Sequence, residues 1–142
     1  PFSTTLRSHQ QQEQPQLLSQ SQYLSIVDST INQIAHTLED MADDERFNDF
    51  EDEKGEVDIT VNEGVLSVHC GSEGTFIISR QTPTQQLWLS SPVSGPWHYT
   101  YNRENASWVC TKGELPFFDR MDEELSKVFQ LEIKVPRNRP NK

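Results

Sequence analysis

The sequence predicts an α+β fold, a two-layer α-β sandwich in which an N-terminal and a C-terminal helix pack on one face of a five- to six-stranded antiparallel sheet. Two observations lead to this prediction. Apolar residues recur at helical spacing near both ends of the chain, and runs with period-two alternation fill the middle. Consecutive strands joined by short turns pair antiparallel, and two helices with one apolar stripe each must cover the same face.

The first helix is predicted from about Ser21 to Asp43. Its apolar residues recur with the period of a helix and form one stripe, which consists of Val27, Ile31, Ile34, Leu38 and Met41. Ser19 followed by Gln22 has the spacing of a capping box at the start of this helix. Acidic residues gather towards its C-terminal end, where the macrodipole favours cations. This costly placement indicates a role outside folding.

The remaining elements follow from turn residues and apolar patterns. Residues 44–56 are expected to be a charged connector that Phe47 and Phe50 hold against the body. Strand-like runs occupy residues 57–111, with turns at 62–64, 71–74, 82–83 and 92–96. The second helix is predicted to begin near Pro116, a residue suited to a first helical position, and to end at Pro136.

Composition divides the chain into three parts. Residues 1–22 are rich in Gln and Ser and are predicted to be disordered. Residues 23–135 are predicted to form one domain, and residues 136–142 a loose basic tail. The lead carries Arg7 and His9 among polar residues, which is compatible with a removed presequence. No apolar run approaches the ~20 residues needed to span a bilayer.

The net charge of the protein lies in one segment. Residues 28–58 contain twelve acidic and two basic side chains, so they carry a net charge of −10, which equals the net charge of the whole 142-residue chain. The rest of the chain is balanced. A surface of this kind attracts cations and basic partners, and it repels nucleic acid and anionic membranes.

The acidic segment also supplies candidate metal ligands, because clustered carboxylates bind hard cations. His36, Glu39 and Asp40 lie at i, i+3 and i+4, so they share one face of the helix, and a strand beside the helix would add Asp58. The candidate set is Asp28, His36, Glu39, Asp40, Asp43, Asp44 and Asp58. The segment does not match a calcium loop, and no Cys/His cluster forms a zinc site. The alternative is an acidic face that serves only solubility.

The sheet face that the helices leave uncovered is a candidate binding surface. Within Gln85–Ser90, period two places both leucines in the core and Gln86, Trp88 and Ser90 on the uncovered face. The same alternation turns His98 outward. An exposed Trp among polar neighbours has the composition of an interaction hot spot. The alternative is that a loop covers Trp88, which would then be purely structural.

Known catalytic motifs are absent from the sequence. It contains no nucleophile elbow, P-loop or dinucleotide fingerprint, which argues against a conventional enzyme with a closed pocket. Cys70 and Cys110 lie in apolar, strand-like runs, and we interpret them as buried thiols rather than as part of a disulfide framework.

Residues 74–96 (GTFIISRQTPTQQLWLSSPVSGP) resemble the central signature of the frataxin family, in a fungal-type form. Residues 28–43 are similar to the first helix of that family, and Trp108-Val109 to its last strand. The resemblance covers about residues 22–133, and it implies the same α-β sandwich that the residue patterns predict.

The resemblance also implies a function. Frataxins are mitochondrial matrix proteins that are made with a cleaved transit peptide and act in iron–sulfur cluster biogenesis and iron homeostasis. They bind iron (Fe2+ or Fe3+) weakly on an acidic ridge. They dock on the cysteine desulfurase–scaffold complex and promote sulfur transfer, with a role as iron chaperone. The alternative that the family leaves open is iron storage, in which clustered carboxylates oxidise Fe2+ to Fe3+ (ferroxidase activity) and a monomer forms iron-dependent oligomers.

Carried over residue by residue, the resemblance makes Trp88 the anchor of a partner-binding face. Ser79 and His98 stand where the family usually has Asn and Arg, which puts partner affinity in question. The predicted partner-binding set is Ser79, Gln81, Gln86, Trp88, Ser90 and His98. The acidic ridge would carry Asp28, Glu39, Asp40, Asp43 and Asp58. Because the connector 44–56 is longer and more acidic than usual, we infer that part of the ridge has moved into it.

Overall fold

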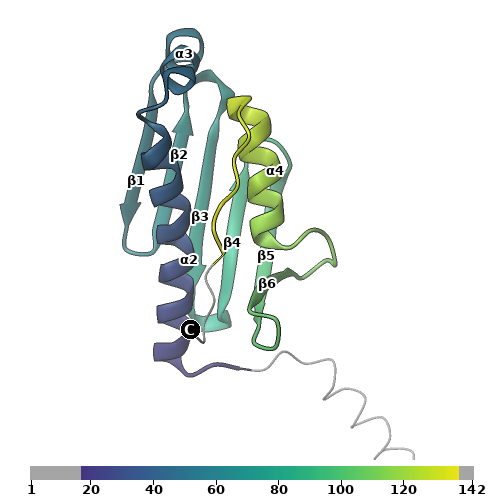
Figure 1. Cartoon of the computed structure of the whole chain (residues 1–142). Coiled ribbons are helices and arrows are strands. Elements are labelled where there is room, and N and C mark those ends of the chain that lie inside the picture. Colours follow the sequence, from purple (N-terminus) through teal and green to yellow (C-terminus); the bar gives the residue numbers. More distant parts are fainter. Residues whose placement is uncertain (1–16, 138–142) are drawn as a thin grey trace, which may run out of the picture.

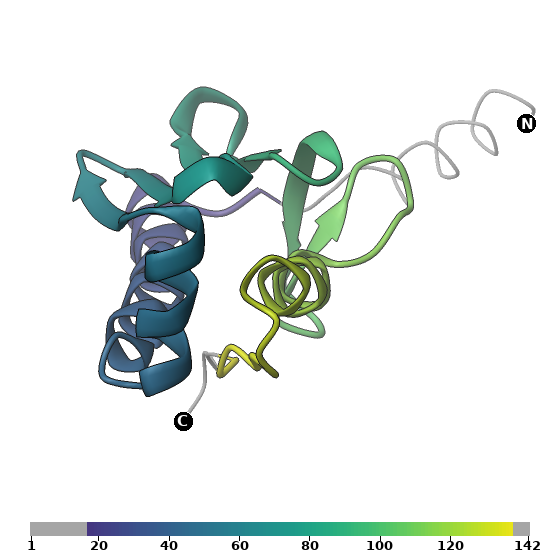
Figure 2. The same ribbon diagram turned by 90° about the horizontal axis from the view of Figure 1, so that it is seen from above.

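A computed structural model of the chain describes residues 17–137 and shows helices on one face of an antiparallel sheet (Figure 1). The predicted two-layer α+β sandwich is therefore confirmed. The sheet has six strands in the order β1-β2-β3-β4-β5-β6, with the bounds Val57–Asn62, Val65–Cys70, Thr75–Gln81, Gln86–Ser91, Gly95–Asn102 and Ser107–Cys110. Helices α2 (Gln20–Met41) and α4 (Phe117–Phe129) lie on the same side of this sheet (Figure 2). None of the described helices is both long and apolar enough to cross a membrane.

The register of the sheet separates core residues from surface residues. Each strand pairs antiparallel with the next one in sequence, and Trp88 of β4 stands opposite Ser79 of β3 and His98 of β5. The neighbouring leucines, Leu87 and Leu89, are buried under the helices. The predicted inward and outward residues of this strand are thus observed.

Helix α2 begins as the capping box predicts. The hydroxyl of Ser19 accepts a hydrogen bond from the backbone N–H of Gln22 (3.1 Å), and the side-chain oxygen of Gln22 accepts one from the N–H of Ser19 (3.0 Å). Leu18 is buried, and its backbone exchanges two hydrogen bonds with the side-chain amide of Gln85 (3.0 and 2.6 Å). The predicted boundary between residues 22 and 23 therefore falls inside an ordered helix, while residues 1–16 of the predicted disordered segment lie outside the described residues.

The apolar stripe of α2 is buried as predicted, except that Met41 is half-buried. Two polar side chains of the helix, Tyr23 and Thr30, fix it over the sheet. The Tyr23 hydroxyl donates to the carbonyl of Gln86 (2.6 Å) and accepts from the N–H of Gln81 (2.9 Å). Nearer the middle of the helix, the indole N–H of Trp108 donates to the hydroxyl of Thr30 (2.9 Å). Buried polar groups must be paired in this way, so these contacts specify one docking position for the helix.

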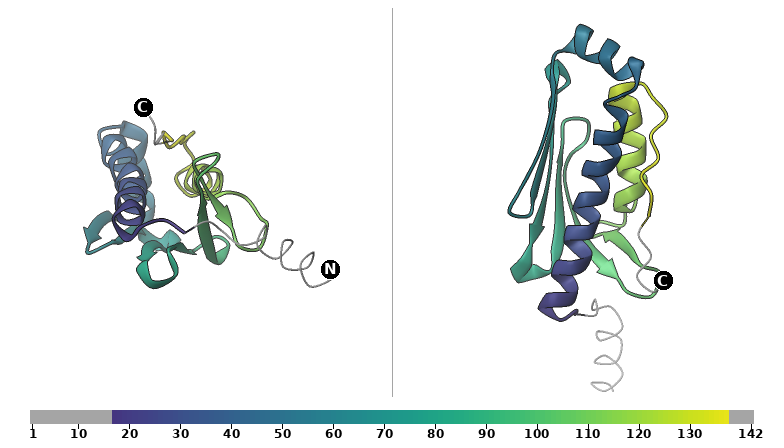
Figure 3. Two further views of the ribbon diagram at one scale, coloured as in Figure 1. Left: turned by 90° about the horizontal axis from the view of Figure 1, so that it is seen from below. Right: turned by 60° about the vertical axis from the view of Figure 1, so that its left-hand side comes forward.

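The predicted connector is in fact a helix, α3 (Glu45–Lys54), which lies across one end of the sandwich between α2 and β1 (Figure 3). Its cap is Asp44, whose carboxylate accepts the backbone N–H of Arg46 (2.8 Å). Phe47 and Phe50 are buried as predicted, and both rings contact Phe129 of α4, with centroid distances of 5.5 and 4.8 Å. Only two apolar residues mark this helix in the sequence, too few to reveal its period.

The second helix starts at Phe117 with Pro116 as its N-cap, but the prediction that it extends to Pro136 is wrong. It ends at Phe129 because Gln130 adopts a left-handed conformation (φ 55°). The chain then returns as an extended segment alongside α2 and α4 (Figures 1 and 3). Its buried residues alternate with exposed ones and are Leu131, Ile133 and Val135.

Hydrogen bonds hold this C-terminal segment in place. The hydroxyl of Ser126 accepts the N–H of Ile133 (2.9 Å), and the carboxylate of Asp122 accepts the N–H of Val135 (2.8 Å). Arg137 pairs with Asp119 and Asp122, both at 2.8 Å. The first residues of the predicted loose tail are therefore tied down, and residues 138–142 lie outside the described residues.

Both cysteines are buried free thiols, as predicted. Burial, reinforced by the charge of Glu73, raises the pKa of Cys70 to about 12. A thiol in the unfolded chain ionises near pH 8.5. Between these values the unfolded state loses a proton that the folded state retains, so folding stability falls as pH rises.

The first prediction follows from that thiol. Between pH 9 and 10 the free energy of unfolding should fall, and Cys70 should contribute about 1.4 kcal/mol of that fall per pH unit. Urea unfolding of the unaltered protein and of Cys70→Ala at several pH values isolates this contribution. Parallel slopes for the two proteins would contradict the assignment.

The second prediction concerns the extended C-terminal segment. Ile133→Ala should lower the free energy of unfolding by about 2–5 kcal/mol, because it removes a buried side chain between two helices. Lys134→Ala, at the adjacent exposed position, serves as the matched control and should change stability by less than about 0.5 kcal/mol. Equal effects in urea unfolding would mean that this segment does not contribute to the core.

Candidate functional site

Exposed carboxylates gather at the end of the molecule where α3 lies. They come from the last turn of α2, from the short link that follows it, from α3 and from the residue before β1. We call this set the acidic end, and its members are Glu39, Asp40, Asp43, Glu45, Asp49, Asp52, Glu53 and Glu56. The predicted transfer of negative charge into the connector agrees with this placement, since four of these residues belong to α3.

The predicted metal ligands do not converge on one point. His36 Nδ1 lies 3.6 Å from an oxygen of Glu39, and both side chains are largely exposed. Asp40 is exposed in the last turn of α2, and Asp43 is exposed in the link that follows this helix. Within residues 17–137 no three His, Cys, Asp or Glu side chains form a group that could hold a metal ion. The acidic end therefore presents dispersed carboxylates, which suit loose and exchangeable cation binding.

Two other predicted ligands are engaged in structural contacts. Both carboxylate oxygens of Asp28 accept hydrogen bonds from the guanidinium of Arg80 on β3 (2.8 and 2.9 Å), so this pair links α2 to the sheet. Asp44 caps α3 and pairs with the side chain of Arg46 at 2.9 Å. Hydrogen bonds from Arg46 lower the pKa of Asp44, which keeps this carboxylate ionised and occupied.

Asp58 is separated from the other predicted ligands by the sheet. Strand β1 does lie beside α2, as the prediction required. However, Asp58 pairs in register with exposed His69, whereas its neighbours Val57 and Ile59 stand opposite buried Cys70 and Val68. Alternation thus places Asp58 on the uncovered face. The expectation that it joins the carboxylates of α2 is not met.

The uncovered sheet face, which we call the open face, is centred on two stacked rings. The indole of Trp88 and the imidazole of His98 lie 4.1 Å apart between centroids, and their planes differ by 9°. The indole N–H donates to the side-chain oxygen of Gln86 (2.7 Å). Gln81 donates to the hydroxyl of Ser79 (3.4 Å). Five of the six predicted partner-binding residues therefore occur in one contiguous group, and Ser90 is exposed two residues after Trp88 on β4.

The open face also carries apolar side chains that the sequence analysis did not single out. The relative solvent exposure of these side chains is 38% for Val65, 40% for Ile77 and 36% for Val109. Their register positions place them around Trp88. Period-two alternation would have identified them. By the same alternation, the described residues of β3 to β6 place no charged side chain on this face. An uncharged surface with a central Trp and an apolar surround is typical of a protein interface.

A buried ion pair supports the open face from the opposite side of the sheet. Arg120 and Glu124 of α4 pair at 3.0 Å, and Glu124 accepts the hydroxyl of Ser91 at 2.5 Å. The hydroxyl of Ser91 in turn accepts the N–H of Val93, and the guanidinium of Arg120 lies 4.0 Å from the ring of Trp97. These contacts fix the hairpin between β4 and β5, which carries Trp88 and His98.

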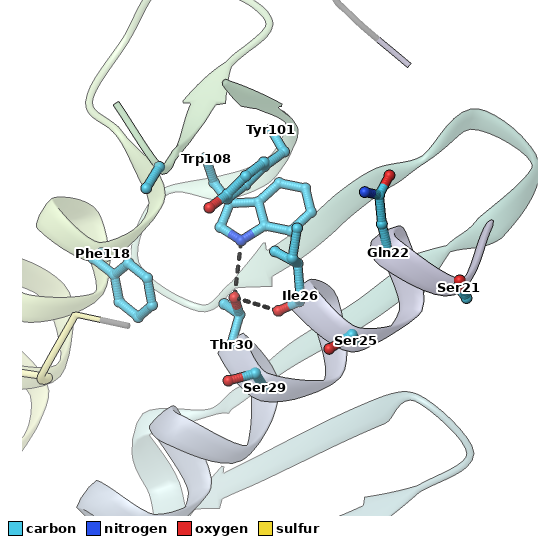
Figure 4. Close-up of a pocket in the computed structure, with 10 residues that line it drawn as sticks. Ser21, Gln22, Ser25, Ile26, Ser29, Thr30, Tyr101, Trp108 and Phe118 are labelled. Carbon is cyan, nitrogen blue, oxygen red and sulfur yellow. Dashed lines mark hydrogen bonds between the residues drawn. The ribbon is translucent and has the colours of Figure 1, made fainter. Parts of the chain in front are cut away.

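A cavity lies elsewhere on the molecule, away from the predicted site residues. It has a volume of about 520 Å³ and opens between the N-terminal half of α2, the ends of β5 and β6, and Phe118 (Figure 4). Tyr101, Trp108 and Phe118 form its aromatic floor, and serines of α2 stand at its rim. None of the predicted site residues lines it, so we assign the candidate site to the open face and the acidic end.

Comparison with known proteins relates this chain to frataxins and CyaY proteins. A family model described as a frataxin-like domain matches residues 16–131. The mitochondrial frataxin homolog of Schizosaccharomyces pombe is 31% identical over 137 residues, which cover 96% of this chain and 82% of the relative. The iron–sulfur cluster assembly protein CyaY of Pseudomonas fluorescens (strain Pf0-1) is 35% identical over 97 residues, which cover 68% of this chain and 76% of that protein.

A solved structure supports the fold. Trimeric frataxin from Saccharomyces cerevisiae, complexed with ferrous iron, matches with a TM-score of 0.60 at 23% identity. The match covers 83% of this chain and 92% of that one.

The third prediction concerns Asp28. Because Arg80 engages it, Asp28→Asn should leave Mn2+ binding at the acidic end within twofold of the unaltered protein, as measured by water-proton relaxation. The same change should lower the free energy of unfolding by less than about 1 kcal/mol, since the ion pair is partly exposed and screened. A severalfold loss of Mn2+ affinity would instead place Asp28 among the ligands.

Proposed function

Because this chain belongs to the frataxin family, we propose that it docks on the cysteine desulfurase–scaffold complex and promotes sulfur transfer. Family members are named iron–sulfur cluster assembly proteins, and this is the role that we assign to the chain at the family level. Its eukaryotic relatives are named mitochondrial frataxins, and the protein is accordingly mitochondrial. The matrix is the compartment in which we place the docking.

The observation that carries this proposal is the open face. Trp88 is half-buried and held flat by His98 and Gln86, and exposed Val65, Ile77 and Val109 surround it. Preorganised aromatic side chains in an uncharged setting lose little entropy on binding, which makes them effective anchors for a protein partner. The buried Arg120–Glu124 pair keeps the supporting hairpin rigid.

The acidic end has a separate role in this proposal. Its carboxylates lie at the end of the sandwich, while the open face carries no charge on β3 to β6 among the described residues. Long-range attraction by the acidic end would steer a basic partner and speed encounter, and the open face would then provide the lasting contact. Dispersed carboxylates also suit a chaperone that holds ferrous iron weakly and releases it as cargo.

The test of docking is a desulfurase–scaffold assay of sulfide formation with the unaltered protein and with Trp88→Ala. Loss of a central hot-spot Trp costs about 2 kcal/mol or more, so docking should weaken by about thirtyfold and the stimulation should disappear at moderate concentration. Leu115→Ala removes an exposed apolar side chain outside the strands of the open face and serves as the matched control. Equal stimulation by all three proteins would contradict the proposal.

The fourth prediction tests the acidic end. The triple variant Asp49→Asn, Asp52→Asn, Glu53→Gln should weaken docking severalfold and reduce its dependence on salt, because steering charges are lost. Glu51 is left unchanged because its carboxylate accepts the backbone N–H of Val57.

The matched control neutralises three exposed acids outside the acidic end, which are Glu104, Glu114 and Glu123. Affinities are measured between 50 and 300 mM salt. The same loss in both triple variants would show that net charge, and not the acidic end, governs encounter.

A further inference from the structure

We propose that His98 is the positioning residue for Trp88 and that it makes docking at the open face depend on pH. The proposal deepens the proposed function and rests on it. It assigns to His98 two linked tasks: holding the indole in its docking orientation, and tightening that hold when the imidazole gains a proton.

The geometry shows how the indole is held. Trp88 and His98 are directly paired across β4 and β5, and their rings stack with a 4.1 Å centroid separation and an interplanar angle of 9°. One edge of the indole is fixed separately, by the 2.7 Å hydrogen bond from its N–H to Gln86. His98 is exposed while Trp88 is half-buried, so the imidazole covers the indole. The stack with His98 and the hydrogen bond to Gln86 therefore hold the ring from two directions.

The strength of the stack depends on whether the imidazole carries a proton. A neutral imidazole packs on an indole by dispersion, whereas an imidazolium adds a cation–π attraction of about 0.5–1 kcal/mol at exposed sites. Histidine is the side chain whose charge normally changes between pH 5 and 8. Protonation would therefore hold the indole more firmly, and a ring that is already fixed loses less freedom on docking.

Among the described residues, the neighbouring strands present no charged side chain to His98 on the open face. The side chains that face His98 from β3, β4 and β6 are uncharged and are Ser79, Gln81, Gln86, Ser90 and Val109. On its own strand, Pro96 and Thr100 flank it on this face. The charged groups nearest in sequence are Lys112, after β6, and Arg103 and Glu104, in the turn between β5 and β6. His69 and Asp58 lie farther away, on β2 and β1, which are three and four strands from β5.

The first arm of the test uses the free protein and needs no partner. Nuclear magnetic resonance follows the indole N–H signal of Trp88 and the ring protons of His98 from pH 5 to 8.5. We expect the Trp88 signal to shift with the titration of His98, and this shift to vanish in His98→Gln. An unchanged titration of Trp88 in His98→Gln would overturn the proposal.

The second arm measures docking on the desulfurase–scaffold complex at pH 6 and 8. Relative to His98→Arg, which is charged at both values, the unaltered protein should lose about two- to fivefold in affinity between pH 6 and 8. His98→Gln should bind more weakly than the unaltered protein at pH 6 and show no pH dependence relative to His98→Arg. His69→Gln, which removes the other histidine of the open face, should behave like the unaltered protein.

The outcomes separate this proposal from the one on which it rests. Equal pH dependence in the unaltered protein and in His98→Gln would overturn the role of His98 even though docking occurs. Failure of the unaltered protein to dock at either pH would contradict the proposed function instead. The magnetic resonance arm would then decide by itself whether His98 positions Trp88.

Discussion

The structure depends on the register of β3, β4 and β5 under the two helices. Alternation along β4 sends Leu87 and Leu89 into the core and Trp88 to the open face, so a slip of one residue would exchange them. Tyr23 of α2 fixes this register, because its hydroxyl forms hydrogen bonds with the backbone of Gln81, which ends β3, and of Gln86, which begins β4. The register of these strands thus decides both which residues form the core and which residues lie on the open face.

Patterns local in sequence predicted most of the fold. The capping box at Ser19, the stripe of α2 and the alternation around Trp88 are decided by residues a few positions apart. The errors arose where distant residues decide. Helix α3 is held by the contacts of Phe47 and Phe50 with Phe129, and α4 stops at Phe129, after which Leu131, Ile133 and Val135 are buried from an extended segment. The helix propensities of the individual residues do not reveal these long-range contacts.

For the candidate site, too, the sequence predicted the features that depend on local patterns and missed those that depend on distant contacts. Alternation placed Trp88 and His98 on one face, but it does not specify that their rings stack. The acidic residues were correctly expected to be concentrated, yet Asp28 pairs with Arg80, Asp44 caps α3 and Asp58 lies across the sheet. In the described residues, carboxylates gather at the acidic end, whereas β3 to β6 present an uncharged area around Trp88 on the open face.

Hydrogen–deuterium exchange on the assembled desulfurase–scaffold complex tests the central claim most directly, because it maps the surface that docking buries. The account predicts slower exchange of backbone amides in β3 to β5 around Ser79, Trp88 and His98, with exchange in the N-terminal half of α2 unchanged. Protection confined to α2 and α4, with the strands around Trp88 unaffected, would contradict docking through the open face.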